Sequence, residues 1–246
     1  ENGFGRAATM EETFWVHDRN LAHVASRGSA LWWMDLPGNG WLDSAEIWQN
    51  CARLKKIYEH IGRARSPYRP QVAVVVDEES LLHLSYGRHV TNPLLYETRR
   101  ELYRMGVPLG FYLLSDVCAG RVGWPRVYIF LNAFVLDEVK RQGLLRQIRR
   151  RGKTAVWFYA PGFIEDRAAS PGLVSALTGI EVKEERARIP ARAIVSEPAI
   201  RGLPGLRAGE EFGLGVPLSP LFYVSDGSAT QLATYAASRR TAAALK

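Results

Sequence analysis

The pattern of apolar and polar positions predicts a short first region built from two helices and one strand. Residues 11–27 place apolar side chains at helical spacing among charged ones, and Asp43 or Ser44 is expected to cap a second helix. Between them, residues 29–36 form a run that is almost wholly apolar. Such a run is typical of a strand buried on both faces, as in a parallel sheet. Residues 1–62 are therefore expected to form helix, buried strand, loop and helix.

A polar stretch with two prolines, residues 63–70, is the best linker candidate in the chain. Beyond it, strands alternate with helices to about residue 179, which predicts a parallel, doubly wound α/β sheet with helices on both faces. We divide the chain into a first domain, residues 1–64, and a second, residues 65–246. The predicted strands are 71–76, 109–114, 126–131 and 153–159, and the predicted helices are 92–105, 136–151 and 171–177.

From residue 182 onward the pattern becomes a series of short runs between Gly- and Pro-rich turns. We predict four short strands there, at 188–196, 212–216, 221–225 and 231–235. The last residues are rich in Ala and Arg and carry no clear ending signal, so we expect the second domain to be cut short at its C-terminus.

Composition indicates an ordinary globular protein. Apolar residues make up 47% of the chain and charged residues 23%, so a sizeable core is available. The two cysteines, Cys51 and Cys118, form no C-x-x-C pair and have no His at ligand spacing, so we expect neither disulfides, nor a metal site, nor a cofactor. Residues 1–9 lack an apolar signal core, and every apolar run is strand-sized. We expect a soluble protein without a membrane partner, with the cytoplasm favoured as its compartment.

The net charge of +7 comes entirely from residues 66–246. The densest basic run contains Lys140, Arg141, Arg146, Arg149, Arg150, Arg151 and Lys153. It could be a phosphate-binding face, or a solvated helix face whose last cations complement the helix dipole. We favour the solvated face and do not expect a nucleic-acid partner, because no nucleic-acid motif accompanies the charge. A nucleic-acid-binding module using helix 136–151 stays open as an alternative.

A first candidate site lies around Asp35, which follows two tryptophans and precedes a Gly-rich loop holding Trp41. Barrel enzymes place substrate groups at the carboxyl ends of their strands. Indole faces stack on sugar rings, and a carboxylate accepts hydrogen bonds from sugar hydroxyls. We therefore predict a carbohydrate-binding surface made by Trp33, Asp35 and Trp41. The alternative, two core tryptophans and an Asp that caps a turn, stays open.

A second candidate site collects the polar residues that end predicted parallel strands, which are Asp77, Glu78, Asp116 and Asn132. Ligands of open α/β sheets bind at this edge, near the point where the strand order reverses. The alternative is that these loops are polar because they are exposed and cap helices. The sequence contains no G-x-G-x-x-G fingerprint, no P-loop and no G-x-S-x-G elbow, so the usual dinucleotide, nucleotide and esterase sites are not indicated.

These residues together resemble a known family. Residues 28–36 with Gly40 and Trp41 resemble the last barrel strand and the following loop of proteins related to family forty-two glycoside hydrolases, the bacterial β-galactosidases. Residues 75–80, 128–134 and 156–162 resemble the domain that follows that barrel, called the β-galactosidase trimerisation domain, whose fold is similar to class I glutamine amidotransferases. The resemblance covers about residues 20–180.

The resemblance implies the end of a (β/α)8 barrel joined to a flavodoxin-like, amidotransferase-like sheet, in an enzyme of carbohydrate metabolism that forms homo-oligomers. Glu1 is the candidate for the family's nucleophile; the acid/base belongs to an earlier strand, which this sequence lacks. Asn132 stands where related amidotransferases carry a nucleophilic Cys. We therefore expect a non-catalytic, oligomer-forming and site-completing region. A free-standing amidotransferase-like hydrolase using Cys118 is the other alternative.

Overall fold

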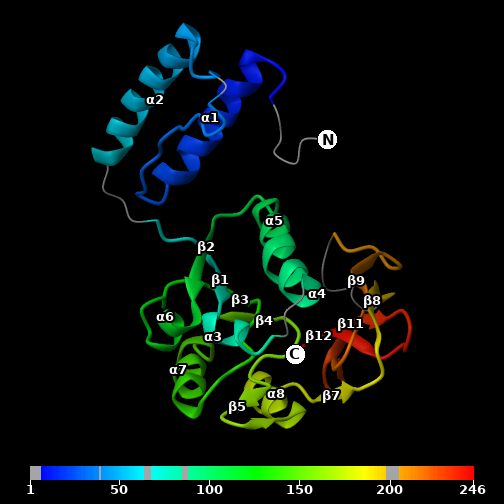
Figure 1. Cartoon of the computed structure of the whole chain (residues 1–246). Helices are drawn as coiled ribbons and strands as arrows, with labels where there is room; N and C mark the ends of the chain where they lie inside the picture. Colours follow the sequence, from blue (N-terminus) through cyan, green and yellow to red (C-terminus); the bar gives the residue numbers. More distant parts are fainter. Residues whose placement is uncertain (1–6, 39, 64–67, 85–87, 198–204) are drawn as a thin grey trace. The chain divides into compact units, whose positions relative to one another are not determined.

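The computed structural model describes residues 7–38, 40–63, 68–84, 88–197 and 205–246 (Figure 1). Glu1, the candidate nucleophile, lies outside the described residues. The chain divides into two compact units, Glu1–Arg69 (unit 1) and Pro70–Lys246 (unit 2). Among the described residues no helix has the length and apolar character needed to cross a membrane.

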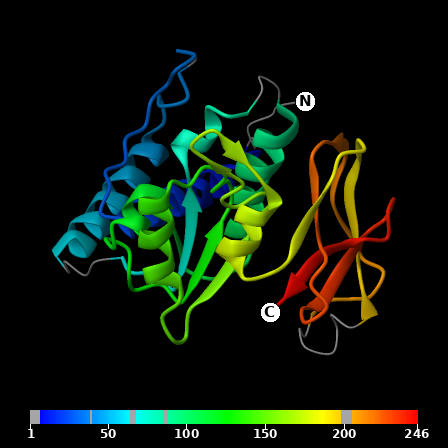
Figure 2. The same ribbon diagram turned by 90° about the horizontal axis from the view of Figure 1, so that it is seen from below.

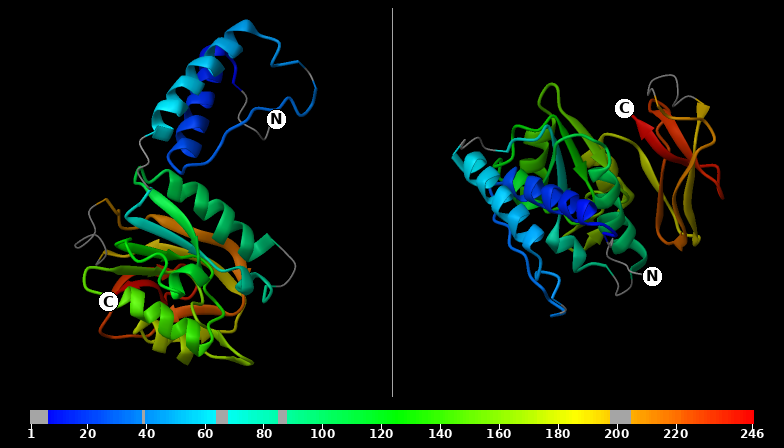
Figure 3. Two further views of the ribbon diagram at one scale, coloured as in Figure 1. Left: turned by 90° about the vertical axis from the view of Figure 1, so that its left-hand side faces the viewer. Right: turned by 90° about the horizontal axis from the view of Figure 1, so that it is seen from above.

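Unit 1 is built on two helices, α1 (Met10–Ala25) and α2 (Ala45–Arg63). The Thr9 side chain accepts from the Glu12 N–H and caps α1, and the Ser44 hydroxyl accepts from the Ile47 N–H at 3.4 Å, which confirms the predicted start of α2. The helices lie side by side (Figure 3) and bury Leu21 against Leu54.

The prediction of a strand at residues 29–36 is wrong, because these residues form no strand. Leu31 and Trp33 pack on the helix pair, whereas Trp32, Met34 and Leu36 are 68%, 48% and 79% exposed. A strand buried on both faces needs strands beside it, and the described part of unit 1 contains only helices. The segment therefore buries one face and exposes the other.

Unit 2 contains a four-stranded parallel sheet, which confirms the predicted α/β fold. Its strands are β1 (Val72–Val76), β2 (Leu109–Leu113), β3 (Val127–Phe130) and β4 (Thr154–Trp157), in the order β2-β1-β3-β4. Val74 pairs with Phe111 on one side and with Ile129 on the other. The strand order therefore reverses between β1 and β3, as in flavodoxin-like sheets.

Helices cover both faces of this sheet (Figure 2). On one face Val75 and Phe130 pack with Leu144 of α7, and on the other Val74 and Ile129 pack with Leu102 of α5. The predicted helix 92–105 is in part a π-helix, η1, which includes Pro93. The helices are α3 (Glu78–Leu81), α4 (Arg88–Thr91), η1 (Asn92–Glu97), α5 (Thr98–Tyr103), α6 (Leu114–Cys118), α7 (Glu138–Ile148) and α8 (Pro171–Thr178).

A second, antiparallel sheet follows, and Figure 2 shows it as distinct from the parallel one. The four predicted strands are present, together with β7 and β12, which the sequence pattern missed. The strands are β7 (Val182–Glu185), β8 (Ile189–Val195), β9 (Glu211–Leu218), β10 (Leu221–Val224), β11 (Thr230–Tyr235) and β12 (Thr241–Leu245), in the order β7-β10-β12-β11-β8-β9. A short hairpin, β5 (Ile164–Glu165) and β6 (Ala168–Ala169), precedes α8.

Aromatic side chains join the two sheets of unit 2. The Phe222 ring of β10 lies 5.3 Å from the Tyr159 ring and 4.9 Å from the Phe163 ring, both beyond the end of β4. The Tyr159 hydroxyl donates to the Pro220 carbonyl at 2.6 Å, and burial raises the pKa of Tyr159 to about 12. The antiparallel sheet therefore packs against the carboxyl side of the parallel strands.

Candidate functional site

The loop of unit 1 brings Trp33 and Trp41 together around a buried histidine. The His17 ring centroid lies 5.3 Å from that of Trp33 and 6.1 Å from that of Trp41. Asp35 lies at the base of the same loop, where its carboxylate accepts from the Gly40 N–H at 2.6 Å. The carboxylate therefore caps the turn, while the two indoles lie beside one imidazole.

His17 is held by a chain of polar side chains that sequence reasoning missed. Its Nδ1 lies 3.3 Å from Asn50 Nδ2, and Asn50 Oδ1 accepts from Arg53 Nε and Nη2 at 3.0 and 2.8 Å. Arg53 also pairs with Asp18. Because a guanidinium group only donates, the Asn50 amide must turn its oxygen to Arg53 and its NH2 to His17.

This orientation makes Nδ1 of His17 an acceptor, so the ring is neutral and carries its proton on Nε2. Burial lowers the pKa of His17, and the nearby charge of Asp18 only partly opposes this effect. His17 and Asn50 are 33 positions apart in the sequence. The sequence signal that could have identified His17 as buried is its position one turn before Leu21 on the apolar face of α1.

A cavity of about 440 Å³ opens beside Trp33 between the two helices and the residue 30–33 segment. Its walls are mainly apolar, and the indole Nε1–H of Trp33 is buried without an acceptor. The lining residues are Leu21, Ala30, Leu31, Trp33, Trp48, Cys51, Ala52, Leu54, Lys55 and Tyr58. The cavity offers apolar contacts and few polar ones.

At the carboxyl edge of the parallel sheet, Asp77 and Asn132 lie together at the point where the strand order reverses. The Asp77 N–H donates to Asn132 Oδ1 at 2.8 Å, and Asn132 Nδ2 donates to the Asp77 carbonyl at 2.7 Å. The side-chain amide of Asn132 thus bonds to the backbone N–H and carbonyl of Asp77 in the way that the backbone of a neighbouring strand would, and it extends the pairing of β1 with β3. Both residues are buried, with 8% and 1% of their surfaces exposed.

Ser80 completes this buried network. The Asp77 carboxylate accepts from the Ser80 N–H at 2.9 Å and from the Ser80 hydroxyl. The Ser80 Oγ in turn accepts from the backbone N–H groups of Phe134 and Val135, both at 3.0 Å. Both hydrogen bonds from Ser80 to Asp77 end on Oδ2 of the carboxylate, and the network locks the loops after β1 and β3 together.

The other two predicted edge residues lie apart from this network. Glu78 is exposed in the first turn of α3. Asp116 lies in α6, where its carboxylate accepts from Arg121 Nη1 at 2.7 Å. Among the described residues no group of three His, Cys, Asp or Glu side chains is placed to hold a metal ion.

The position after β3 has neither the residue nor the backbone of a nucleophile elbow. Positive φ angles among described non-glycine residues occur at Tyr159, Asp166 and Arg239, so Asn132 does not have the positive φ of a sharp, strained turn. Cys118 ends α6, and burial raises the pKa of its thiol to about 11. A thiol with that pKa is protonated at neutral pH and is a poor nucleophile.

No protein-family model and no curated protein matches this sequence. Solved structures do match. A β-galactosidase from Rahnella sp. R3 aligns with a TM-score of 0.57 and 16% identity over 78% of this chain. One from Bacillus circulans sp. alkalophilus aligns with a TM-score of 0.54 and 17% identity over 78%. A GH42 β-galactosidase from G. stearothermophilus aligns with a TM-score of 0.55 and 14% identity over 80%.

The chain spans only 28% to 29% of the length of these three enzymes. It therefore has the fold of a portion of GH42 β-galactosidases, as the sequence resemblance predicts. At these identities the likeness establishes the fold and leaves the activity open.

Proposed function

We propose that this chain is a non-catalytic, oligomer-forming and site-completing region of a β-galactosidase-like glycoside hydrolase that acts on carbohydrate. The observation that carries the proposal is the set of large apolar side chains that unit 1 exposes, in a chain whose fold is that of part of a β-galactosidase. Trp15, Trp32 and Trp48 are 60%, 68% and 58% exposed, and Leu36 is 79% exposed. Large apolar side chains that are exposed in this number are typical of a surface that contacts other protein surfaces.

Two of the carboxylates predicted at the sheet edge, Asp77 and Asp116, support a non-catalytic role. Glycoside hydrolysis uses two carboxyl groups on opposite sides of the scissile bond. Asp77 is buried in hydrogen bonds to Ser80, and Asp116 is paired with Arg121. The raised pKa of Cys118 argues equally against the alternative of an amidotransferase-like hydrolase.

Unit 1 contributes to a sugar site through its two clustered indoles. Trp33 and Trp41 lie on one loop, and both contact the ring of His17 on α1. The faces of the two indoles would stack on a galactosyl ring. Trp41→Ala should weaken the binding of methyl β-galactoside, followed by tryptophan fluorescence, about fivefold, because stacking on one indole supplies about 1 kcal/mol. Trp15→Ala is the matched control, since Trp15 is an exposed indole on the same unit. Equal responses in the two variants would remove Trp41 from the site.

Oligomer formation is assigned to unit 2, at the surface where α3 meets α7. Leu82 and Val139 are 85% and 80% exposed there, and they flank the ion pair between Glu79 and Lys140. We expect sedimentation velocity at micromolar concentration to show an oligomer that Leu82→Ser with Val139→Ser converts to a monomer. The same change at Phe212, exposed on β9, is the control and should leave the oligomer intact.

The catalytic part of the proposal is tested with a panel of nitrophenyl β-glycosides and, separately, with glutamine. We expect no turnover of either by the purified chain. Turnover of either substrate that disappears on Glu1→Gln or on Cys118→Ala would establish a hydrolase and overturn the proposal. A monomeric wild-type chain would overturn the oligomer assignment alone.

A further inference from the structure

The basic run predicted as one helix face is divided by the structure into two groups. Lys140 pairs with Glu79, and the buried Arg141 donates to the carbonyls of Leu173 and Gly162 at 3.1 and 3.3 Å. These two cations serve the fold. Helix α7 ends at Ile148, so the remaining cations lie on its last turn and beyond it.

Those remaining cations meet others from a different part of the chain. Arg126 directly precedes β3 and Lys153 directly precedes β4, and the Thr154 N–H donates to the Arg126 carbonyl at 2.8 Å. Lys153 Nζ donates to the Gly123 carbonyl at 2.8 Å. Arg150 Nη1 lies beside Gly123 as well, 3.8 Å from where a Cβ on that residue would stand. Three cations from separate elements thus gather at the amino end of the sheet.

We call this surface, made by residues 121–126 and 146–153, the basic edge. It holds seven Lys and Arg residues and no Asp or Glu. Arg121 is paired with Asp116, but no ion pair of the described chain involves Arg126, Arg146, Arg149, Arg150 or Arg151. The C-terminal dipole of α7 supplies only about half a negative charge, which is far too little to balance them.

The charges at the basic edge act on one another. Burial lowers the pKa of Lys153, and the positive charges of Arg150 and Arg126 lower it further. No carboxylate opposes this effect on Lys153. The basic edge is therefore a region of positive potential that an anion would neutralise.

One aromatic side chain lies within the basic edge. Trp124 is 36% exposed, and its other side packs edge-on against Tyr112 with the ring centroids 5.9 Å apart. Proteins that bind single-stranded nucleic acid stack successive bases on several aromatics, and duplex readers insert an element into a groove. A single indole among guanidinium groups suits one sugar ring with charged substituents better than either.

We propose that the basic edge binds a negatively charged polysaccharide, with Arg126 and Arg150 on its carboxylate or sulfate groups and Trp124 against a sugar ring. Guanidinium groups match both anions because their planar N–H donors form paired hydrogen bonds. The choice of a saccharide backbone rests on the proposed function. The positive potential of the basic edge, and so its affinity for an anion, does not depend on the proposed function. The basic edge would hold a polymeric substrate close to the hydrolase at the sheet end opposite the Asp77–Asn132 network.

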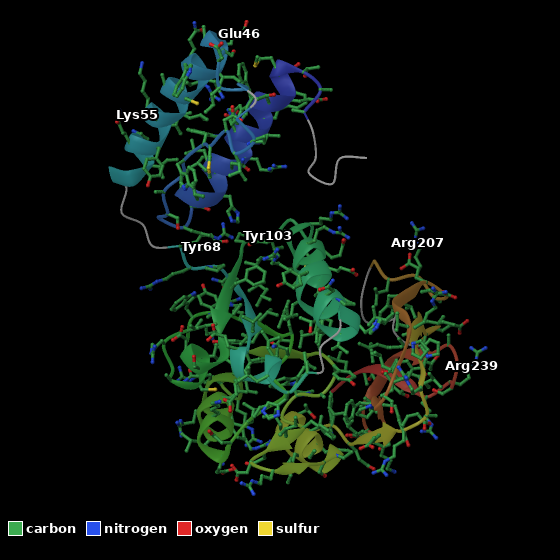
Figure 4. All side chains as sticks on the ribbon, in the orientation of Figure 1. Glu46, Lys55, Tyr68, Tyr103, Arg207 and Arg239 are labelled. Carbon is green, nitrogen blue, oxygen red and sulfur yellow. The ribbon has the colours of Figure 1, made fainter. Side chains whose placement is uncertain are left out.

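The experiment compares the full chain with two double variants at low ionic strength. Arg126→Gln with Arg150→Gln discharges the basic edge. Arg207→Gln with Arg239→Gln removes the same charge from loops of the antiparallel sheet, where Figure 4 shows both side chains projecting outward. The probes are immobilised polygalacturonate, dextran sulfate, neutral galactan and a short DNA duplex. Melting temperatures verify that each variant is folded.

We expect both anionic polysaccharides to bind at the basic edge, whereas any binding of neutral galactan, through Trp33 and Trp41, should be equal in the two double variants. The basic-edge variant should lose about tenfold or more in affinity, because charge-assisted contacts are removed. The control should lose less than about threefold, since distant charges are screened. Trp124→Leu should weaken polysaccharide binding severalfold and leave binding to DNA unchanged.

Equal losses in the two double variants, or no binding to either anionic polysaccharide, would overturn the basic edge as a site and leave the proposed function standing. A preference for the DNA duplex that disappears with the basic-edge variant would instead show an anion site of another class. That result would overturn the proposed ligand and count against the proposed function as well.

Discussion

Removing the Asn50 amide should destabilise unit 1 through His17. In Asn50→Leu, the buried Nδ1 of His17 loses its donor, and a buried acceptor without a partner costs about 1–3 kcal/mol. Arg53 loses two bonds to Asn50 but is half-exposed and keeps Asp18, so its share is small. We therefore expect Asn50→Leu to lower the free energy of unfolding of unit 1 by about 1–3 kcal/mol at pH 8.

The assay is urea unfolding followed by tryptophan fluorescence, because unit 1 carries five of the seven tryptophans. With a urea dependence of about 1–3 kcal/mol per molar, the midpoint should fall by roughly 1 M. Gln49→Leu is the matched control, since Gln49 is an exposed amide on the same helix. Equal midpoints for the two variants would refute the reasoning.

The pH dependence gives a second, independent check. The pKa of folded His17 lies below its ordinary value, so the unfolded chain binds the proton more readily. The stability due to neutral His17 should be present above about pH 6.5 and be lost as the pH falls through the folded pKa. Asn50→Asp should reverse this sign, because a carboxylate beside the ring raises its pKa. Stability of unit 1 that is flat from about pH 5 to 8 in both proteins would contradict the assignment.

Three further changes test unit 2. With Cys51 replaced by Ser, alkylation of Cys118 should be roughly a hundredfold slower than that of a free thiol at neutral pH and should accelerate up to about pH 11, as followed by mass spectrometry. Asn132→Asp should lower the unfolding free energy by about 2 kcal/mol or more, because it turns an oxygen toward the Asp77 carbonyl. Gly143→Ala should cost about 1–3 kcal/mol in a thermal melt, because its Cβ would stand 2.5 Å from the Cys118 carbonyl oxygen.

The parallel sheet was predictable because its signals are local. Each strand is a short apolar run, such as residues 72–76, followed by a polar residue that begins the next helix. Asp77 shows this, since it ends β1 and caps α3. The apolar run at residues 29–36 misled for the same reason. Composition indicates an extended, partly buried segment but cannot supply the neighbouring strands that a sheet requires.

The side-chain networks were not predictable, because they join positions far apart in the chain. Asn132 was expected at the sheet edge, but its two hydrogen bonds to Asp77 span 55 positions in the sequence. Nothing in the local sequence shows whether such a residue joins two loops or binds a ligand. The same holds for His17 and Asn50. Strand β12 was missed because its central alanines carry no alternating pattern and little strand propensity.

The place of β12 within the antiparallel sheet has a consequence for folding. The described strands of this sheet form two groups. In one group β7 pairs with β10, and in the other β8 pairs with both β9 and β11. Among the described strands only β12 joins the groups, because it pairs with β10 on one side and with β11 on the other. Until residues 241–245 insert between β10 and β11, the sheet consists of two separate ribbons with open edges. Such edges invite pairing with other chains, so β12 governs both the joining of the two ribbons and their exposure to aggregation during refolding.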